Sequence, residues 1–185
     1  MVDPSDVTKY DRNKGELEEF LLFCIVVAGK TAKTQAKKLE KFLSLADIGN
    51  TPFDKVRRMM VLGELEENLR KVGMGQYSKL VRSLSEIVRV EPQTCMIEDL
   101  EAITGIGPKT ARFFLLHSRK DQKIAVLDTH ILKWMRDELG LNVPKSTPSK
   151  KKYLELEKIF ISHCELYSKD IAELDLEIWN KYSRK

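Results

Sequence analysis

Apolar side chains recur every three or four residues along most of the chain, which is the spacing of helices buried on one face. The first such pattern begins at Gly15 and has its apolar positions at Leu17, Phe20, Leu21, Cys24 and Ile25. The same spacing predicts nine further helices, at residues 34–45, 51–60, 64–72, 79–90, 94–103, 108–117, 128–139, 153–164 and 169–179. Only residues 124–127 form a short apolar run that favours an extended segment. The pattern predicts an all-α protein.

Composition allows one core, or one core divided between two small lobes, in a chain of 185 residues with 42% hydrophobic content. No apolar run approaches the ~18 residues that span a bilayer. The first residues lack the basic-then-apolar order of a secretory signal, so we expect an intracellular protein without a membrane partner. Three scattered cysteines with no CxxC pair indicate neither a disulfide framework nor a zinc site.

The net charge of +4 permits a nucleic-acid partner without requiring one. Lysines concentrate at Lys30 and along the second predicted helix. They are either an ordinary solvated face or a surface that meets phosphates.

Two glycines mark a tight reversal between the helices 94–103 and 108–117. Gly105 and Gly107 keep this turn free of side chains, so that backbone N–H groups there and at Lys109 can approach a phosphate oxygen near the positive end of the second helix. The backbone carbonyls of Glu101, Ile103 and Ile106 can also hold a monovalent cation, Na⁺ or K⁺. The alternative is a simple packing turn between two helices.

A lysine and an aspartate near this turn can meet. A helix from residue 108 to His117 runs ~15 Å, and the residues from there to Asp128 can span up to ~30 Å, so Asp128 can return beside Lys109. A partly desolvated lysine can attack carbon, and a nearby carboxylate can stabilise a cation or move a proton. The alternative is a surface lysine and an ordinary aspartate helix cap.

The segment Gly105-Ile106-Gly107-Pro108-Lys109-Thr110-Ala111, followed by Leu127-Asp128-Thr129-His130, closely resembles the helix-hairpin-helix DNA glycosylase superfamily. The turn at residues 73–79 is similar to the family's turn that wedges into the duplex, and residues 28–31 fall where the family has its first DNA-facing turn. The resemblance covers the chain from about residue 17.

This resemblance implies a two-lobed helical fold with DNA bound in a cleft between the lobes. We expect a loose leader at residues 1–14, and one lobe built from the two ends of the chain, 15–30 and 131–185. The other lobe, 31–130, would contain the helix-hairpin-helix at 98–118.

A lysine at the hairpin marks the bifunctional members of this superfamily, which remove a base and nick the backbone. The resemblance implies that Lys109 attacks C1′ of a flipped nucleotide and forms a Schiff base, after which β-elimination cuts the strand. Asp128 would stabilise the cationic sugar, and His130 would contact a neighbouring phosphate. Gln76 or Tyr77 would fill the gap left by the flipped base, and Lys30 would face DNA.

The C-terminal part of the chain indicates which damaged base the protein removes. The endonuclease III branch carries a four-cysteine iron–sulfur cluster there, whereas this chain has only Cys164, so we expect no such cluster and no required cofactor. The end of the chain, with Trp179 and a terminal lysine, resembles the short prokaryotic 8-oxoguanine branch. In this reading Trp179 stacks on the base, with Asp175 and Lys185 as further pocket residues.

The favoured function is therefore excision of 8-oxoguanine from damaged double-stranded DNA with associated abasic-site lyase activity, by a monomer that is cytoplasmic and nucleoid-associated, or nuclear in a eukaryote. The alternatives are a glycosylase for another damaged base, such as an oxidised pyrimidine, and a non-catalytic hairpin module that only binds DNA. Trp134 is expected in the core, and His117 and His163 are read as structural.

Overall fold

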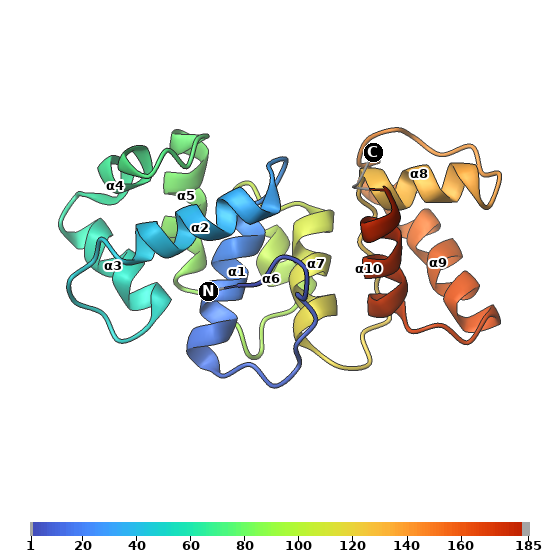
Figure 1. Cartoon of the computed structure of the whole chain (residues 1–185), viewed down its shortest axis with the longest axis horizontal. Helices are drawn as coiled ribbons and strands as arrows, with labels where there is room; N and C mark the ends of the chain where they lie inside the picture. The colour runs from blue at the N-terminus through green and yellow to red at the C-terminus, as the bar shows by residue number, and fades with distance from the viewer. Residues whose placement is uncertain (1, 183–185) are drawn as a thin grey trace.

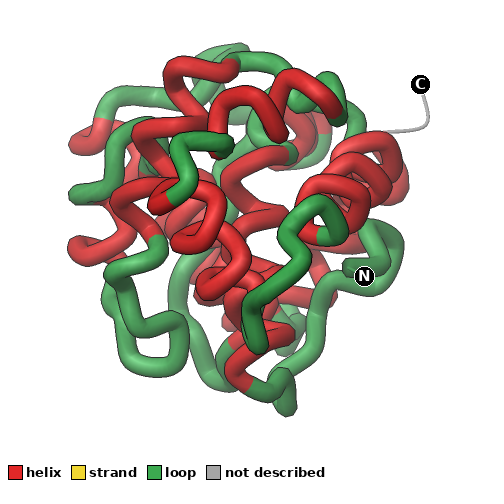
Figure 2. The backbone as a smooth tube through the Cα atoms, turned by 90° about the vertical axis from the view of Figure 1, so that its left-hand side faces the viewer, coloured by secondary structure: helices red, strands yellow, loops and turns green. Residues whose placement is uncertain are grey.

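The computed structural model describes residues 2–182, and within them the chain is all-α, with ten helices and no strand (Figure 2). The all-α prediction is confirmed. No helix in the described range combines the length and the apolar character needed to cross a bilayer. The helices are α1 (Lys14–Val26), α2 (Ala32–Leu43), α3 (Pro52–Val61), α4 (Leu65–Lys71), α5 (Tyr77–Ile87), α6 (Ile97–Glu101), α7 (Pro108–Ser118), α8 (Thr129–Asp137), α9 (Lys150–Leu166) and α10 (Ile171–Tyr182).

Two large hydrophobic cores divide the described part of the molecule, and a third, small cluster of Leu116, Val126 and Ala172 connects α7 with α10. The helices α1 to α7 surround the larger core, and α8 to α10 surround the smaller one together with the extended segment that precedes α8 (Figure 1). Trp134 lies in the smaller core against Phe160, with ring centroids 5.6 Å apart, as predicted for a core aromatic. The packing of α10 on α7 joins the two halves.

Helix α1 belongs to the larger core, packed against α2, α3, α5 and α7. The grouping of residues 15–30 with 131–185 is therefore corrected. Every side chain from Phe20 to Val26 is buried, and a helix that is apolar on all sides lies inside a protein rather than on one face of it. That unbroken apolar run was the signal for a central helix.

The N-terminal segment, residues 2–13, is also fixed against the larger half, so the prediction of a loose leader is wrong. Val7 is 1% exposed. The guanidinium of Arg12 lies 4.0 Å from the Phe20 ring centroid and donates hydrogen bonds to the carbonyls of Val7 and His117. Polar contacts of this kind leave no periodic pattern in the sequence.

The helix ends differ from the prediction by a few residues in most helices, and two of these differences affect the site. Helix α6 is five residues long and not ten, because residues 94–96 precede it without helical structure and residues 102–103 already belong to the hairpin turn. Helix α10 continues to Tyr182, whose side chain is buried against α8, so it extends three residues beyond the predicted end at residue 179. Lys185 lies outside the described residues.

Candidate active site

The hairpin between α6 and α7 is held on α5. The N–H and the hydroxyl of Thr104 donate to the Glu86 carboxylate at 2.6 and 2.8 Å, and the Ser83 hydroxyl donates to the Thr104 carbonyl. These bonds from Thr104 hold the pKa of Glu86 below its ordinary value. The turn is closed by the N–H of Ile106, which donates to the carbonyl of Ile103 at 3.0 Å.

The two glycines of the hairpin have different reasons to be there. Gly105 has φ +85°, a left-handed conformation, and a Cβ at this position would stand 2.5 Å from the Cε of Lys79. Gly107 caps α7 with φ −100°, and a Cβ there would meet nothing within 4 Å. Both residues are exposed, and within the described chain no group accepts a hydrogen bond from either N–H. The fold requires the first glycine, and the second keeps open the space in front of α7.

A cavity of about 1000 Å³ lies between the two halves of the molecule. Its walls come from the N-terminal segment, the turn after α1, α7, the start of α8 and one face of α10. Among the predicted site residues, it is lined by Lys30, Lys109, Asp128, His130, Asp175 and Trp179. Residues that are far apart in the sequence therefore meet in one pocket.

Lys109 enters the pocket from the first turn of α7. Pro108 occupies the first helical position, which suits proline because its missing N–H would have no partner there. The Lys109 amine lies 6.0 Å from the centroid of the Phe113 ring, which also lines the cavity. The lysine is half-buried, with an apolar ring on one side and open space on the other.

Asp128 faces the same cavity from the N-cap of α8. Its Oδ1 accepts the N–H groups of His130 and Ile131 at 2.8 and 2.9 Å, while Oδ2 has no hydrogen-bond partner among the described residues. The predicted helix cap and the predicted catalytic carboxylate are thus the same group. One oxygen fixes the carboxylate, and the other is available to a reacting molecule.

Trp179 and His130 line one side of the pocket, with ring centroids 6.4 Å apart and planes nearly perpendicular. Trp179 is half-buried, which leaves part of its face available for stacking on a base. The roles of Trp179 in stacking and of His130 in phosphate contact stay predictions.

Asp175 is buried one helical turn before Trp179 and bonded to His117, which was read as merely structural. The Oδ2 of Asp175 is 3.2 Å from Nε2 of His117, and Nδ1 of the same ring is 2.7 Å from the hydroxyl of Thr8. Burial raises the pKa of Asp175, against the opposing effect of the His117 hydrogen bond. This Thr8–His117–Asp175 chain ties the N-terminal segment to the pocket and was missed in the sequence.

The turn at residues 73–76 stands beside a group of lysines. Lys30 donates to the Met74 carbonyl at 2.7 Å, and Lys38 donates to the Gly73 carbonyl. Burial, with the nearby charges of Lys38 and Lys79, lowers the pKa of Lys30. A cluster of positive charge held on backbone carbonyls is suited to DNA phosphates.

Gln76 leads this turn into α5 in a left-handed conformation, φ +53°, and is exposed. A strained exposed residue at such a place fits the predicted role of filling a gap in the duplex. Tyr77 instead packs under Arg70, whose guanidinium carbon lies 4.4 Å from the centroid of the Tyr77 ring. Neither residue lines the cavity, and neither do Gly105 and Gly107.

Comparisons with known proteins agree on one family. A family model described as "8-oxoguanine DNA glycosylase" matches residues 5–169. The 8-oxoguanine DNA glycosylase/AP lyase of Methanocaldococcus jannaschii is 30% identical over 181 residues, covering 91% of this chain and 82% of the relative. The Thermotoga maritima protein of the same name is 32% identical over 129 residues, which are 64% of this chain and 61% of the relative.

The fold comparison gives the same result. The crystal structure of the M. jannaschii 8-oxoguanine glycosylase/lyase in complex with 15mer DNA containing 8-oxoguanine matches with a TM-score of 0.72 at 26% identity. The match covers 95% of this chain and 84% of that one. The family model spans both halves of the molecule, including the hairpin, Lys109 and Asp128. The chain therefore belongs to the 8-oxoguanine DNA glycosylase family of helix-hairpin-helix proteins.

Proposed function

We propose that this protein removes 8-oxoguanine from duplex DNA and cuts the strand at the abasic site through a Schiff base on Lys109. The observation that carries the proposal is the convergence of Lys109, Asp128 and Trp179 on one pocket beside the hairpin. The family and the names of its relatives support the same reaction. A pocket of about 1000 Å³ has room for one extruded nucleotide.

The pocket supplies a group for each step. The Lys109 amine attacks C1′ of the flipped nucleotide, and the glycosidic bond breaks with its electron pair leaving on the base. The proton that the lysine nitrogen gives up passes by way of the Asp128 carboxylate to the departing base. The Oδ2 of Asp128 stabilises the positive charge that develops on the sugar. Opening of the sugar ring gives the iminium on Lys109, loss of a C2′ proton then breaks the C3′–O bond, and water releases the lysine.

Borohydride trapping tests the nucleophile. Wild-type protein mixed with an 8-oxoguanine duplex and borohydride is expected to give a covalent protein–DNA band, and Lys109→Gln is expected to give none. Retained trapping in Lys109→Gln would assign the nucleophile elsewhere. Binding of duplex DNA without excision or trapping by the wild type would favour the non-catalytic hairpin module.

The lesion itself is tested by a panel of duplexes that differ in one damaged base. Fastest cleavage at 8-oxoguanine supports the proposal, whereas preference for an oxidised pyrimidine would support the other glycosylase.

A DNA substrate also implies that the protein works in the compartment that holds DNA. One molecule provides the whole pocket, which supports action as a monomer.

The cation at the hairpin is a separate proposal. The Ile103 carbonyl already accepts the Ile106 N–H and has a second lone pair free for Na⁺ or K⁺. The Glu101 carboxylate is paired with Arg112 and Lys150, so only its backbone carbonyl remains for the cation. If the cation binds, the affinity for DNA at constant ionic strength should fall when K⁺ is replaced by a large organic cation.

A further inference from the structure

The extended segment 124–127 carries the chain from α7 to Asp128 through the interior. Ala125 and Leu127 are completely buried, and no strand within the described residues pairs with this segment. Its backbone polar groups therefore need other partners, since an unpaired buried group costs about 1–3 kcal/mol. The Val126 carbonyl accepts the Asp128 N–H at 2.8 Å, and two side chains of α9 are the partners of Ala125 and Leu127.

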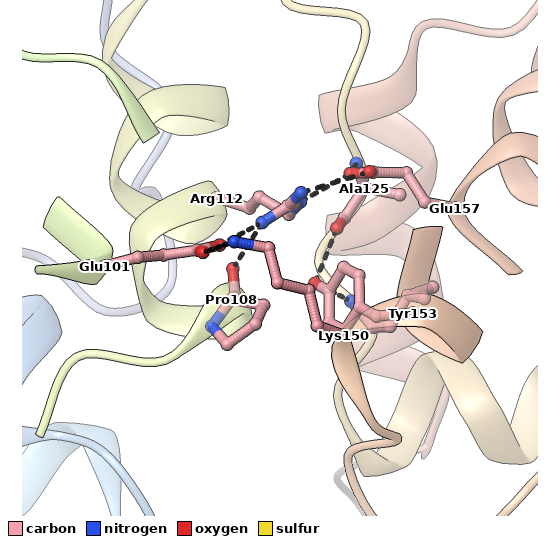
Figure 3. A network of polar contacts seen from close by, with 8 residues as sticks. Glu101, Pro108, Arg112, Ala125, Lys150, Tyr153 and Glu157 are labelled. Carbon is pink, nitrogen blue, oxygen red and sulfur yellow. Dashed lines mark hydrogen bonds and ion pairs between the residues drawn. The ribbon is translucent and has the colours of Figure 1, made fainter. Parts of the chain in front are cut away.

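Tyr153 and Glu157 bond this backbone directly (Figure 3). The Tyr153 hydroxyl accepts the Leu127 N–H at 2.9 Å and donates to the Ala125 carbonyl at 2.8 Å. The Glu157 carboxylate accepts the Ala125 N–H at 2.9 Å. One turn of α9 thus fixes both the direction and the register of the segment that ends at Asp128.

The same carboxylate is tied to the helix that carries Lys109. Arg112, one turn after Lys109 on α7, donates to Glu157 at 2.7 and 3.3 Å and to Glu101 of α6 at 2.9 Å. Its guanidinium also lies 4.8 Å from the Tyr153 ring centroid. Figure 3 shows Arg112 between Glu101 on one side and Glu157 on the other. Arg112, Tyr153 and Glu157 are buried, so water does not replace the bonds among them.

We propose that Tyr153 and Glu157 are positioning residues that set where the Asp128 carboxylate stands relative to Lys109. The inference rests on the proposed function and adds two residues that do not line the cavity. Misplacement of a reacting group by about 1 Å can reduce a rate about 100-fold. A network that binds the backbone next to Asp128 and the helix of Lys109 controls that distance.

Tyr153→Phe tests the proposal because it removes only the hydroxyl and keeps the ring. The single-turnover excision rate is expected to fall about tenfold or more, with little change in affinity for the lesion duplex. The control is Tyr182→Phe, which removes the hydroxyl of another buried tyrosine of the same half, 3.4 Å from Glu138. That variant is expected to excise at the wild-type rate.

A double-mutant cycle separates positioning from general weakening. If Tyr153 acts through Asp128, then Tyr153→Phe should slow excision much less in the Asp128→Asn background than in the wild type. Equal slowing in both backgrounds, or no slowing in the wild type, would overturn the proposal.

Glu157→Gln provides a second variant, since a glutamine oxygen can still accept the Ala125 N–H. We expect this variant to be slower than wild type, with affinity retained, because the bond to Arg112 loses its charge. A wild-type rate would remove Glu157 from the proposal. Failure of the wild type to cut any lesion duplex is a different result, because it would overturn the proposed function and this inference with it.

Discussion

At Asp128, a single substitution can separate helix capping from chemistry. Asparagine is as good an N-cap as aspartate, so Asp128→Asn should keep α8 intact while removing the negative charge. We expect excision to slow by about 10²–10⁴-fold with an unchanged melting temperature. Asp128→Ala should in addition lose about 1 kcal/mol of stability. Single-turnover cleavage and thermal unfolding measure the two effects, and an Asp128→Asn variant as fast as wild type would contradict the catalytic role.

Individual residues also differ in whether they could be found from the sequence. Lys109, Asp128 and Trp179 were predicted because each lies in a recognisable local motif, and the structure brings all three to one pocket. His117 was not, because its partners Thr8 and Asp175 are 109 and 58 residues away in the sequence. Tyr153 and Glu157 were missed for the same reason, since they act on a segment more than 25 residues earlier.

Within the hairpin, the two glycines allow folding and DNA binding to be tested separately. Gly105→Ala places a side chain at φ +85° and against Lys79, so we expect a loss of about 1–2 kcal/mol in stability. In Gly107→Ala the added methyl group meets no neighbour, so this variant should lose less stability than Gly105→Ala. The methyl group would, however, fill the space through which a phosphate reaches the backbone. Urea unfolding and fluorescence anisotropy with a lesion duplex measure these effects. Normal affinity in Gly107→Ala would place the phosphate elsewhere.

Elements with a strong apolar period were predicted well, and the remainder were not. The helices exist where the spacing placed them, and Pro52 and Asp128 begin α3 and α8 as their chemistry indicates. The sequence did not show which core α1 joins, because its apolar residues point in every direction. Nor did it show the fixed N-terminal segment, which is held by Arg12 and by contacts to His117.

Across the whole molecule, Arg112 joins the two cores through Glu101 and Glu157. Burial tends to raise the pKa of Glu101, but hydrogen bonds from Lys150 and Arg112 outweigh it and hold the pKa below the ordinary value. A carboxyl group with a lowered pKa in the folded state stabilises the protein above its unfolded pKa. This stability is lost as the pH falls through the folded value.

Arg112→Met should therefore destabilise the protein in a pH-dependent way. It leaves the buried Glu157 carboxylate without its ion-pair partner and Glu101 with Lys150 alone, so we expect the free energy of unfolding to fall by about 3–5 kcal/mol at neutral pH. This loss of stability should shrink toward acidic pH, where the Glu101 carboxyl group, whose pKa Arg112 helps to lower, becomes protonated. Urea unfolding at several pH values measures it, with Lys123→Met, which breaks the exposed pair with Glu165, as the control that loses less than about 1 kcal/mol. A deficit independent of pH would mean that lost packing, and not charge, is the cause.

The division of the pocket between two cores has a consequence for the order in which the chain is made. All the buried residues of the core that positions Lys109 and the hairpin precede the end of α7, whereas Asp128, Asp175 and Trp179 lie in the part of the chain that follows. A nascent chain therefore contains the hairpin and Lys109 before it contains Asp128. Under the proposed function, we expect excision only after α10 has been added, because α10 supplies Asp175 and Trp179 to the pocket.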